Sequence, residues 1–205
     1  MPHLALIDYG AGNLHSVHNA LKAAGAGDIA VTANPETVIR ADRIVLPGVG
    51  AYAHCMAALS AIPEMIEALD ARVRGQGVPF LGICVGMQLL ADAGVEHGTT
   101  QGLGWIGGTV RAIEPAGADI KVPHMGWNDV MPSRDQYLIE AGEAYYLHGY
   151  HYEVTAQDDI LATTTHGRPL VAAVGRDNMV GVQFHPEKSQ GYGLSFLNRF
   201  LEWKP

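Results

Sequence analysis

Short apolar runs alternate with helix-like segments through the first half of the chain. Four runs have the length and apolar character of buried strands, at residues 4–7, 29–31, 43–46 and 78–83. Segments with helical spacing or helix-forming composition follow them, at residues 14–24, 35–41, 51–60, 63–74 and 85–91. Asn13 is the candidate N-cap of the first helix, and Pro35 suits the first turn of the second. Strands that alternate with helices predict a mostly parallel central sheet flanked by helices.

The second half of the chain has a different pattern, rich in strands. The predicted strands span residues 105–113, 121–130, 144–154, 160–165, 170–174 and 179–184. Glycine-containing turns at residues 167–169 and 175–178 separate the last three strands and suit hairpins. Residues 191–203 close the chain as a helix with one apolar stripe. We therefore predict a single α/β domain over residues 1–205, with additional antiparallel strands in the C-terminal half.

Length, composition and net charge argue against several classes of function. With 205 residues, 48% hydrophobic and 17% charged, the chain has the composition of a globular protein. The formal net charge of −8, without a basic cluster, argues against nucleic acid or an anionic membrane as partner. Residues 1–8 resemble neither a signal peptide nor a transmembrane segment. The two cysteines form no C-x-x-C or zinc pattern, and the ten histidines form no ligand-like pair with carboxylates. We expect a cytoplasmic protein without a bound metal.

The residues around Cys84 have the pattern of a nucleophile elbow. A buried strand ends near this cysteine, a helix starts after it, and Gly82 and Gly86 flank it in a G-x-C-x-G arrangement. Such a turn strains the backbone of its central residue, and glycines on both sides let neighbouring chains pass closely. The helix N-terminus beside the sulfur favours a thiolate and a developing oxyanion. A buried structural cysteine in a tight turn is the alternative interpretation of this motif alone.

Two glycine-rich loops follow the first and third predicted strands. Residues 8–13 carry two glycines but not the third of a G-x-G-x-x-G motif, which gives a dinucleotide site little support. Residues 47–50 are either an ordinary loop or the source of a backbone N–H for an oxyanion hole. Ligands of parallel α/β sheets bind outside the carboxyl ends of the strands, where both loops lie. Cys55, in the helix that follows, is expected to be a small core residue.

His185 and Glu187 are the candidate partners of the cysteine. If the backbone stays extended from His185 to Glu187, the two side chains point to the same face, two residues apart. A carboxylate beside an imidazole fixes its tautomer and stabilises its charged form, which is what a cysteine nucleophile needs. The alternative is a surface histidine and glutamate at a strand end, separated by a proline. The G-x-C-x-G motif and the glycine loop favour the catalytic interpretation.

At this point the sequence resembles a known family. The motif from Gly82 to Gln88, with His185-Pro-Glu187 about a hundred residues later, resembles the class I (triad) glutamine amidotransferases. Four further runs are similar to the glutaminase subunits of imidazole glycerol phosphate synthases: DYGAGN at 8–13, LPGVGA at 46–51, PHMGWN at 123–128 and HPEKSQ at 185–190. The resemblance extends from residue 4 to residue 200. It implies the flavodoxin-like fold of the family's glutaminase domain.

The resemblance also implies a reaction and its catalytic groups. Cys84 would attack the side-chain amide carbon of L-glutamine, His185 would take and return the proton, and Glu187 would orient it. A γ-glutamyl thioester would form, release ammonia and then be hydrolysed to glutamate. The N–H groups of the oxyanion hole would come from Val85, Val49 and Gly50. No cofactor is implied.

Substrate and partner contacts follow from the same resemblance. Gln88 matches the position that hydrogen-bonds the amino-acid end of the substrate. Gly149 and Tyr150 match the substrate strand, but glycine replaces the usual serine, so only a backbone contact carries over from position 149. The family passes its ammonia to a cyclase subunit, a (β/α)₈ barrel, in histidine biosynthesis. The matching surface would include Asn13, Trp127, Tyr145 and Lys188, which are otherwise ordinary loop and strand residues.

Two other functions compete with this interpretation. A cysteine hydrolase or peptidase would explain Cys84, His185 and Glu187, but not the run at residues 123–128. A regulatory binding module with a silent site would have no need of these three groups together. Glutamine turnover, measured against amidase or peptide cleavage, distinguishes the first alternative.

Overall fold

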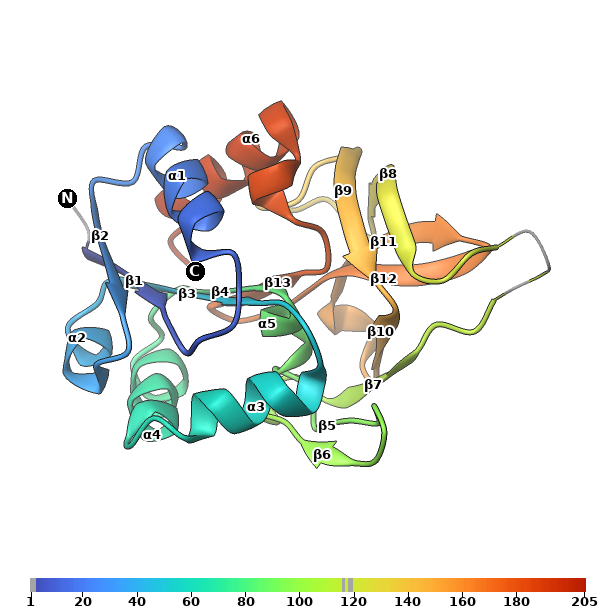
Figure 1. The fold of residues 1–205 in the computed structure, drawn as a ribbon. Helices are drawn as coiled ribbons and strands as arrows, with labels where there is room; N and C mark the ends of the chain where they lie inside the picture. The colour runs from blue at the N-terminus through green and yellow to red at the C-terminus, as the bar shows by residue number, and fades with distance from the viewer. Residues whose placement is uncertain (1–2, 116, 118–119) are drawn as a thin grey trace.

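Helices cover both faces of a long mixed β-sheet, and a smaller sheet lies beside it (Figure 1). The computed structural model describes residues 3–115, 117 and 120–205. The strands of the described chain are β1 His3–Ile7, β2 Asp28–Thr32, β3 Arg43–Gly48, β4 Phe80–Cys84, β5 Ala93–Gly94, β6 Thr100–Gln101, β7 Gly108–Ala112, β8 His124–Pro132, β9 Gly142–His148, β10 Tyr150–Val154, β11 Ile160–His166, β12 Arg168–Arg176 and β13 Met179–Val182. The α-helices are α1 Leu14–Ala23, α2 Pro35–Ile39, α3 Tyr52–Ser60, α4 Met65–Asp70, α5 Val85–Gln88 and α6 Gln190–Glu202.

Parallel strands form one part of the long sheet and antiparallel strands the other. Within the described ranges its order is β2-β1-β3-β4-β13-β12-β11-β8-β9, and neighbours from β2 to β13 pair in parallel. From β13 onward each pair is antiparallel. The small sheet has the order β10-β7-β5-β6. This arrangement confirms the predicted α/β fold, in which strands from the C-terminal half extend a parallel sheet.

The local signals that predicted the elements correspond to specific contacts. The side chain of Asn13 accepts a hydrogen bond from the backbone N–H of Ser16 at 3.3 Å, which caps α1 as predicted. Pro35 occupies the first turn of α2, where its missing N–H costs nothing. The predicted hairpin between β12 and β13 is present, with Arg176 opposite Met179. None of the helices in the described ranges is long and apolar enough to span a membrane.

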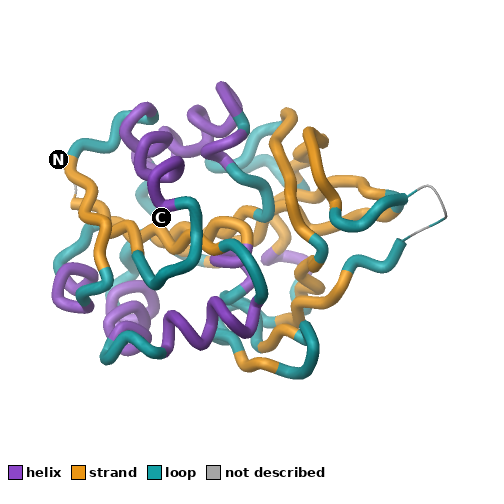
Figure 2. Tube along the Cα trace, viewed as in Figure 1, coloured by secondary structure: helices purple, strands orange, loops and turns teal. Residues whose placement is uncertain are grey.

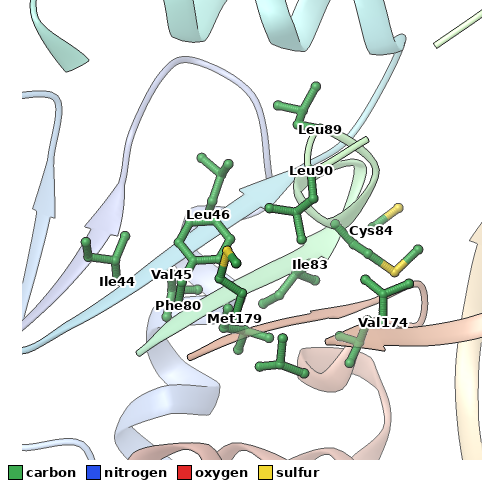
Figure 3. Packing of buried hydrophobic residues seen from close by; sticks show 14 of the residues in the cluster. Ile44, Val45, Leu46, Phe80, Ile83, Cys84, Leu89, Leu90, Val174 and Met179 are labelled. Carbon is green, nitrogen blue, oxygen red and sulfur yellow. The ribbon is translucent and has the colours of Figure 1, made fainter. Parts of the chain in front are cut away.

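The hydrophobic core lies between the parallel strands and the helices on each face. Helices α1 and α6 pack together on one face, and α2, α3 and α4 cover the other (Figures 1 and 2). The close view shows β3, β4 and the leucines after α5 packed with β12 and β13, through Ile44, Val45, Leu46, Phe80, Ile83, Leu89, Leu90, Val174 and Met179 (Figure 3). Burial of these side chains holds the carboxyl ends of the central strands in fixed positions.

The predicted strand over residues 144–154 is wrong in one respect, because it is two strands that belong to different sheets. Strand β9 pairs with β8 in the long sheet, whereas β10 pairs with β7 in the small one. Gly149 lies between them, and its carbonyl accepts a hydrogen bond from the N–H of Ile113 at 2.9 Å. The chain changes sheets at this glycine, so residues from both sheets meet there.

The helix predicted over residues 85–91 ends early, at Gln88. The carbonyl groups of Leu89, Leu90 and Ala91 accept hydrogen bonds from the N–H groups of residues 103–106 instead of continuing the helix. The same bonds shorten the strand predicted from residue 105, since β7 begins at Gly108. Tertiary hydrogen bonds therefore override the helix-forming composition of this segment.

Candidate active site

Cys84 stands at a strained turn between β4 and α5. Its backbone has φ 54° and ψ −112°, which is rare for a residue with a side chain. A Cβ atom on Gly82 would lie 2.6 Å from the carbonyl oxygen of Gly86, and one on Gly86 would lie 1.9 Å from that of Leu46. The strained turn and the close chain passage predicted from the G-x-C-x-G pattern are both present. The turn projects the thiol from the carboxyl edge of the sheet.

His185 meets Cys84 because their strands are neighbours. Strand β13 pairs in parallel with β4, with Val182 opposite Ile83, so the residues that follow both strands leave the sheet at the same edge. The imidazole of His185 lines the same cavity as Cys84, and its Nδ1 lies 2.8 Å from Oε1 of Glu187. Because Nδ1 bonds to the carboxylate, Nε2 is the nitrogen that faces the sulfur. The side chains of His185 and Glu187 are only 4% and 2% exposed.

The expected extended backbone from His185 to Glu187 is wrong, although the two side chains do meet. The main chain of His185 is extended, but residues Pro186–Lys188 form a 3₁₀ turn. The N–H of Lys188 closes this turn onto the carbonyl of His185 at 3.0 Å, and Ser189 Oγ donates to the same carbonyl at 2.7 Å. The turn brings the carboxylate of Glu187 to Nδ1 of His185.

The imidazole of His185 is held in its charged form. Burial acts to lower its pKa, but the hydrogen bonds and charges of Cys84 and Glu187 outweigh burial and raise the pKa to about 10. A charged imidazolium beside the sulfur supplies the positive charge that a thiolate nucleophile requires. The thiol, the imidazole and the carboxylate thus lie in the order expected for the predicted nucleophile, proton carrier and orienting group.

A cavity of about 320 Å³ opens at the sulfur. Its lining includes the predicted nucleophile, histidine, oxyanion and substrate residues, namely Cys84, His185, Val85, Val49, Gly50, Gln88, Gly149 and Tyr150. Glu187 lies behind His185 and does not line the cavity. The volume suits a small polar molecule such as an amino acid. No group of three or more histidine, cysteine, aspartate or glutamate side chains in the described ranges is arranged to hold a metal ion.

Sequence comparison supports the same class of chemistry. Residues 5–203 match the family model described as glutamine amidotransferase class-I. The chain belongs to the class I glutamine amidotransferase family. A protein of Zymomonas mobilis named imidazole glycerol phosphate synthase subunit HisH is 60% identical, over 98% of this chain and 96% of that protein. The HisH subunit of Rhodospirillum rubrum is 50% identical, over 98% and 99% of the two chains.

Solved structures share the fold of this class I glutamine amidotransferase at lower sequence identity. A crystal structure of a glutamine amidotransferase superposes with a TM-score of 0.75 at 16% identity, covering 97% of each chain. PurLQS from Thermotoga maritima gives a TM-score of 0.75 at 18% identity, covering 98% of each chain. At these identities the likeness shows the fold alone.

The loop at residues 47–50 passes close to the elbow of this amidotransferase. A Cβ atom on Gly48 would lie 2.7 Å from the backbone nitrogen of Gly86, so only glycine allows this approach. Gly50 has φ 101°, a conformation that glycine adopts freely. The carbonyl of Val49 accepts a hydrogen bond from Sγ of Cys55 at 3.4 Å. Cys55 is buried as expected, but it also contacts this loop.

Two functional candidates were missed by sequence reasoning. Glu96 lines the cavity, and its carboxylate accepts a hydrogen bond from the N–H of Tyr52 at 2.7 Å. Gln183 is fully buried beside the sulfur, with Nε2 3.6 Å from Sγ of Cys84. Glu96 lies in a loop without a motif, so nothing in the sequence marked it. Gln183 lies two residues before His185, and its polar side chain in an apolar strand was a signal that could have been used.

The predicted partner residues fall into two groups. Trp127 and Tyr145 face each other across β8 and β9 with ring centroids 6.2 Å apart, and Lys188 Nζ lies 5.8 Å from the centre of the Tyr145 ring. Asn13 instead caps α1. The strand pair also exposes two apolar side chains that sequence reasoning missed, Met125 at 66% and Leu147 at 38%, which lie opposite each other. Leu147 and Lys188 line the mouth of the cavity.

A pair of buried histidines connects this strand pair to the cavity. His124 Nδ1 lies 2.9 Å from His148 Nε2, and His148 Nδ1 lies 2.8 Å from the carbonyl oxygen of Tyr150. Because that carbonyl can only accept, His148 carries its proton on Nδ1 and accepts from His124 through Nε2. Burial lowers the pKa of His124 to about 4 and that of His148 to about 3. Both imidazoles are neutral near pH 7.

Proposed function

We propose that this amidotransferase is the glutaminase subunit of imidazole glycerol phosphate synthase, which hydrolyses L-glutamine and delivers ammonia to a cyclase subunit for histidine biosynthesis. The observation that carries the proposal is that Cys84 shares a cavity of amino-acid size with His185, whose imidazole is hydrogen-bonded to Glu187. The 60% identity to a HisH subunit supports the choice of this synthase within the family. The two unpaired cysteines agree with a cytoplasmic location.

The reaction begins with His185 already protonated, having taken the proton of the Cys84 thiol. The thiolate attacks the side-chain amide carbon of glutamine, and the amide oxygen becomes an oxyanion. The N–H of Val85 and the backbone N–H groups around Val49 and Gly50 stabilise this charge. The carbon–nitrogen bond breaks while His185 gives its proton to the leaving nitrogen, which releases ammonia and leaves a γ-glutamyl thioester.

Water completes the cycle. Neutral His185 takes a proton from a water molecule, which attacks the thioester carbonyl, and the carbon–sulfur bond breaks to give glutamate and the Cys84 thiolate. Glu187 keeps Nδ1 protonated through both steps, so that Nε2 always faces the reacting atoms. No cofactor takes part.

The cavity has groups for the amino-acid end of glutamine. Gln88 and Glu96 offer oxygen acceptors to the α-ammonium group, and Glu96 supplies the opposite charge. Gly149 and Tyr150 contribute backbone groups from the point where the chain changes sheets. Gly149 cannot supply a hydroxyl, so recognition there rests on the main chain.

The cyclase docks on the face formed by Met125, Trp127, Tyr145, Leu147 and Lys188, which we call the docking face. Its apolar side chains are exposed, and aromatic anchors of this kind are typical of interfaces. Leu147 and Lys188 also line the mouth of the cavity, so a partner seated here would cover the exit through which ammonia leaves. We assign Asn13 to the edge of the same interface on the family resemblance.

The test is to mix the chain with the cyclase subunit and measure glutamate formation from glutamine, with and without the nucleotide substrate of the cyclase. We expect little hydrolysis by the isolated chain and strong hydrolysis by the complex with nucleotide. The Cys84→Ala variant should bind the cyclase but release no ammonia. Absence of glutaminase activity in the loaded complex, or cleavage of a peptide substrate in preference to glutamine, would contradict the proposal.

A further inference from the structure

A fully buried carboxamide, that of Gln183, connects the nucleophile to the substrate-binding residue Gln88. Its Oε1 accepts a hydrogen bond from Nε2 of Gln88 at 2.9 Å, and its Nε2 donates to Sγ of Cys84 at 3.6 Å. Its own backbone N–H is fixed by the carbonyl of Ala172 at 2.8 Å. Gln183 lies directly after β13, which pairs with β4, so its position relative to the elbow is set by the sheet.

One backbone carbonyl sets the direction of the whole chain of hydrogen bonds. The carbonyl oxygen of Tyr150 can only accept, so the Gln88 atom 3.2 Å from it must be the NH₂ group. The second N–H of that group points to Gln183, whose facing atom must therefore be its oxygen. The NH₂ group of Gln183 is then the end that faces the sulfur. No other assignment of the two amides satisfies all three contacts.

The direction of these hydrogen bonds has a consequence for Cys84 at one end and for Gln88 near the other. Cys84 receives an N–H donor in a dry site, which favours negative charge on sulfur and restrains the side chain. Gln88 has both N–H groups committed, so it can offer only its Oε1 acceptor to a ligand in the cavity. The site is thereby suited to a donor such as the α-ammonium group of an amino acid.

We infer that Gln183 is a positioning residue for the glutaminase reaction: its buried amide orients the Cys84 sulfur through N–H donation and locks Gln88 with its acceptor toward the substrate. The inference rests on the proposed function for its substrate. Gln183 touches neither the substrate nor the proton that His185 moves. It acts through Cys84 and Gln88.

Two substitutions separate the two contacts. Gln183→Glu keeps an oxygen for Gln88 but loses the donor toward Cys84, whereas the similarly shaped Gln183→Met loses both. Gln157→Glu, at an exposed position, is the matched control for the change of charge. Each variant is measured for the rate at which iodoacetamide alkylates Cys84, located by peptide mass spectrometry, and for glutaminase kcat and KM in the complex with the cyclase. Circular dichroism and thermal unfolding verify the fold.

We expect both Gln183 variants to lower Cys84 alkylation and kcat by about ten- to a hundredfold, as loss of a hydrogen bond to a charged group predicts. KM should rise at least fivefold in Gln183→Met but stay within about threefold in Gln183→Glu, which preserves the contact with Gln88. Folded variants with alkylation and kcat within twofold of the parent would overturn the inference, and so would a loss of stability alone. If Gln183→Met does not fold, Gln183→Glu decides. Alkylation needs neither glutamine nor cyclase, so it tests Gln183 even if the proposed function fails.

Discussion

A single methyl group added at Gly86 should separate the elbow from its neighbouring strand. The Cβ atom of Gly86→Ala would lie 1.9 Å from the carbonyl oxygen of Leu46, whereas carbon and oxygen in contact sit at about 3.3 Å. Strand β3 and the start of α5 would therefore have to move apart by about 1.4 Å, the difference between these distances. Backbone lies on both sides of the clash, so no side chain can rotate away to relieve it.

The free-energy cost of this clash can be compared with the helix stability gained when alanine replaces glycine. Overpacking by one carbon costs about 1–3 kcal/mol, and a clash between backbones belongs at the upper end. Replacing glycine by alanine in a helix returns about 0.5–1 kcal/mol. The net loss of about 2 kcal/mol lowers Tm by about 4–8 °C in a protein of this size. The same shift moves the N–H of Val85 away from the oxyanion, which costs about 10²–10³ in kcat.

Gly191→Ala is the matched control. Gly191 also lies near the start of a helix, α6, but an added Cβ atom there would have no neighbour within 4 Å. It should raise the free energy of unfolding by about 0.5–1 kcal/mol and leave kcat unchanged. Urea unfolding and glutaminase assays of the cyclase complex measure both variants. Equal unfolding midpoints for the two, or a Gly86→Ala kcat within fivefold of the parent, would refute the argument.

Three further predictions concern other parts of the site. Glu187→Gln should lower kcat at least a hundredfold with little change in KM, because His185 loses the carboxylate that orients it; an unchanged steady-state rate would exclude that role. The protein should lose stability as pH falls from 6.5 toward 4, because the unfolded chain then binds protons that buried His124 and His148 exclude. The loss is about 1.4 kcal/mol per pH unit for each histidine, and urea unfolding should give a shallower pH dependence in His148→Gln. Met125→Asp should weaken cyclase binding at least tenfold in a titration without slowing Cys84 alkylation, and unchanged binding would remove Met125 from the docking face.

Features encoded by neighbouring residues were predictable from the sequence. The cap at Asn13, the hairpin between β12 and β13 and the strained turn at Cys84 each depend on a few adjacent residues. The sheet could be predicted because apolar runs and helical segments alternate over a long stretch. The pairing of Cys84 with His185 could be proposed from the motifs around each residue, and the family resemblance supported it, although nothing local connects residues a hundred positions apart.

Features set by distant contacts were not predictable. The strand break at Gly149 exists because β9 and β10 pair with different sheets, and α5 ends at Gln88 because residues 103–106 compete for the carbonyl groups that follow. The 3₁₀ turn after His185 depends on hydrogen bonds that include one from Ser189 Oγ. Glu96 reaches the cavity from a loop without any pattern. In each case contacts with residues distant in the sequence, and not the local pattern, decide the structure.

The place of β13 in the sheet has a consequence for protein synthesis. This strand is inserted between β4 and β12, and it is encoded about a hundred residues after the cysteine. On the ribosome, the N-terminal strands emerge and begin to fold while the histidine is still untranslated. A polypeptide truncated before β13 therefore has Cys84 without His185, the residue proposed to move its proton. The proposed catalytic group can therefore assemble only after β13 has joined β4 and β12.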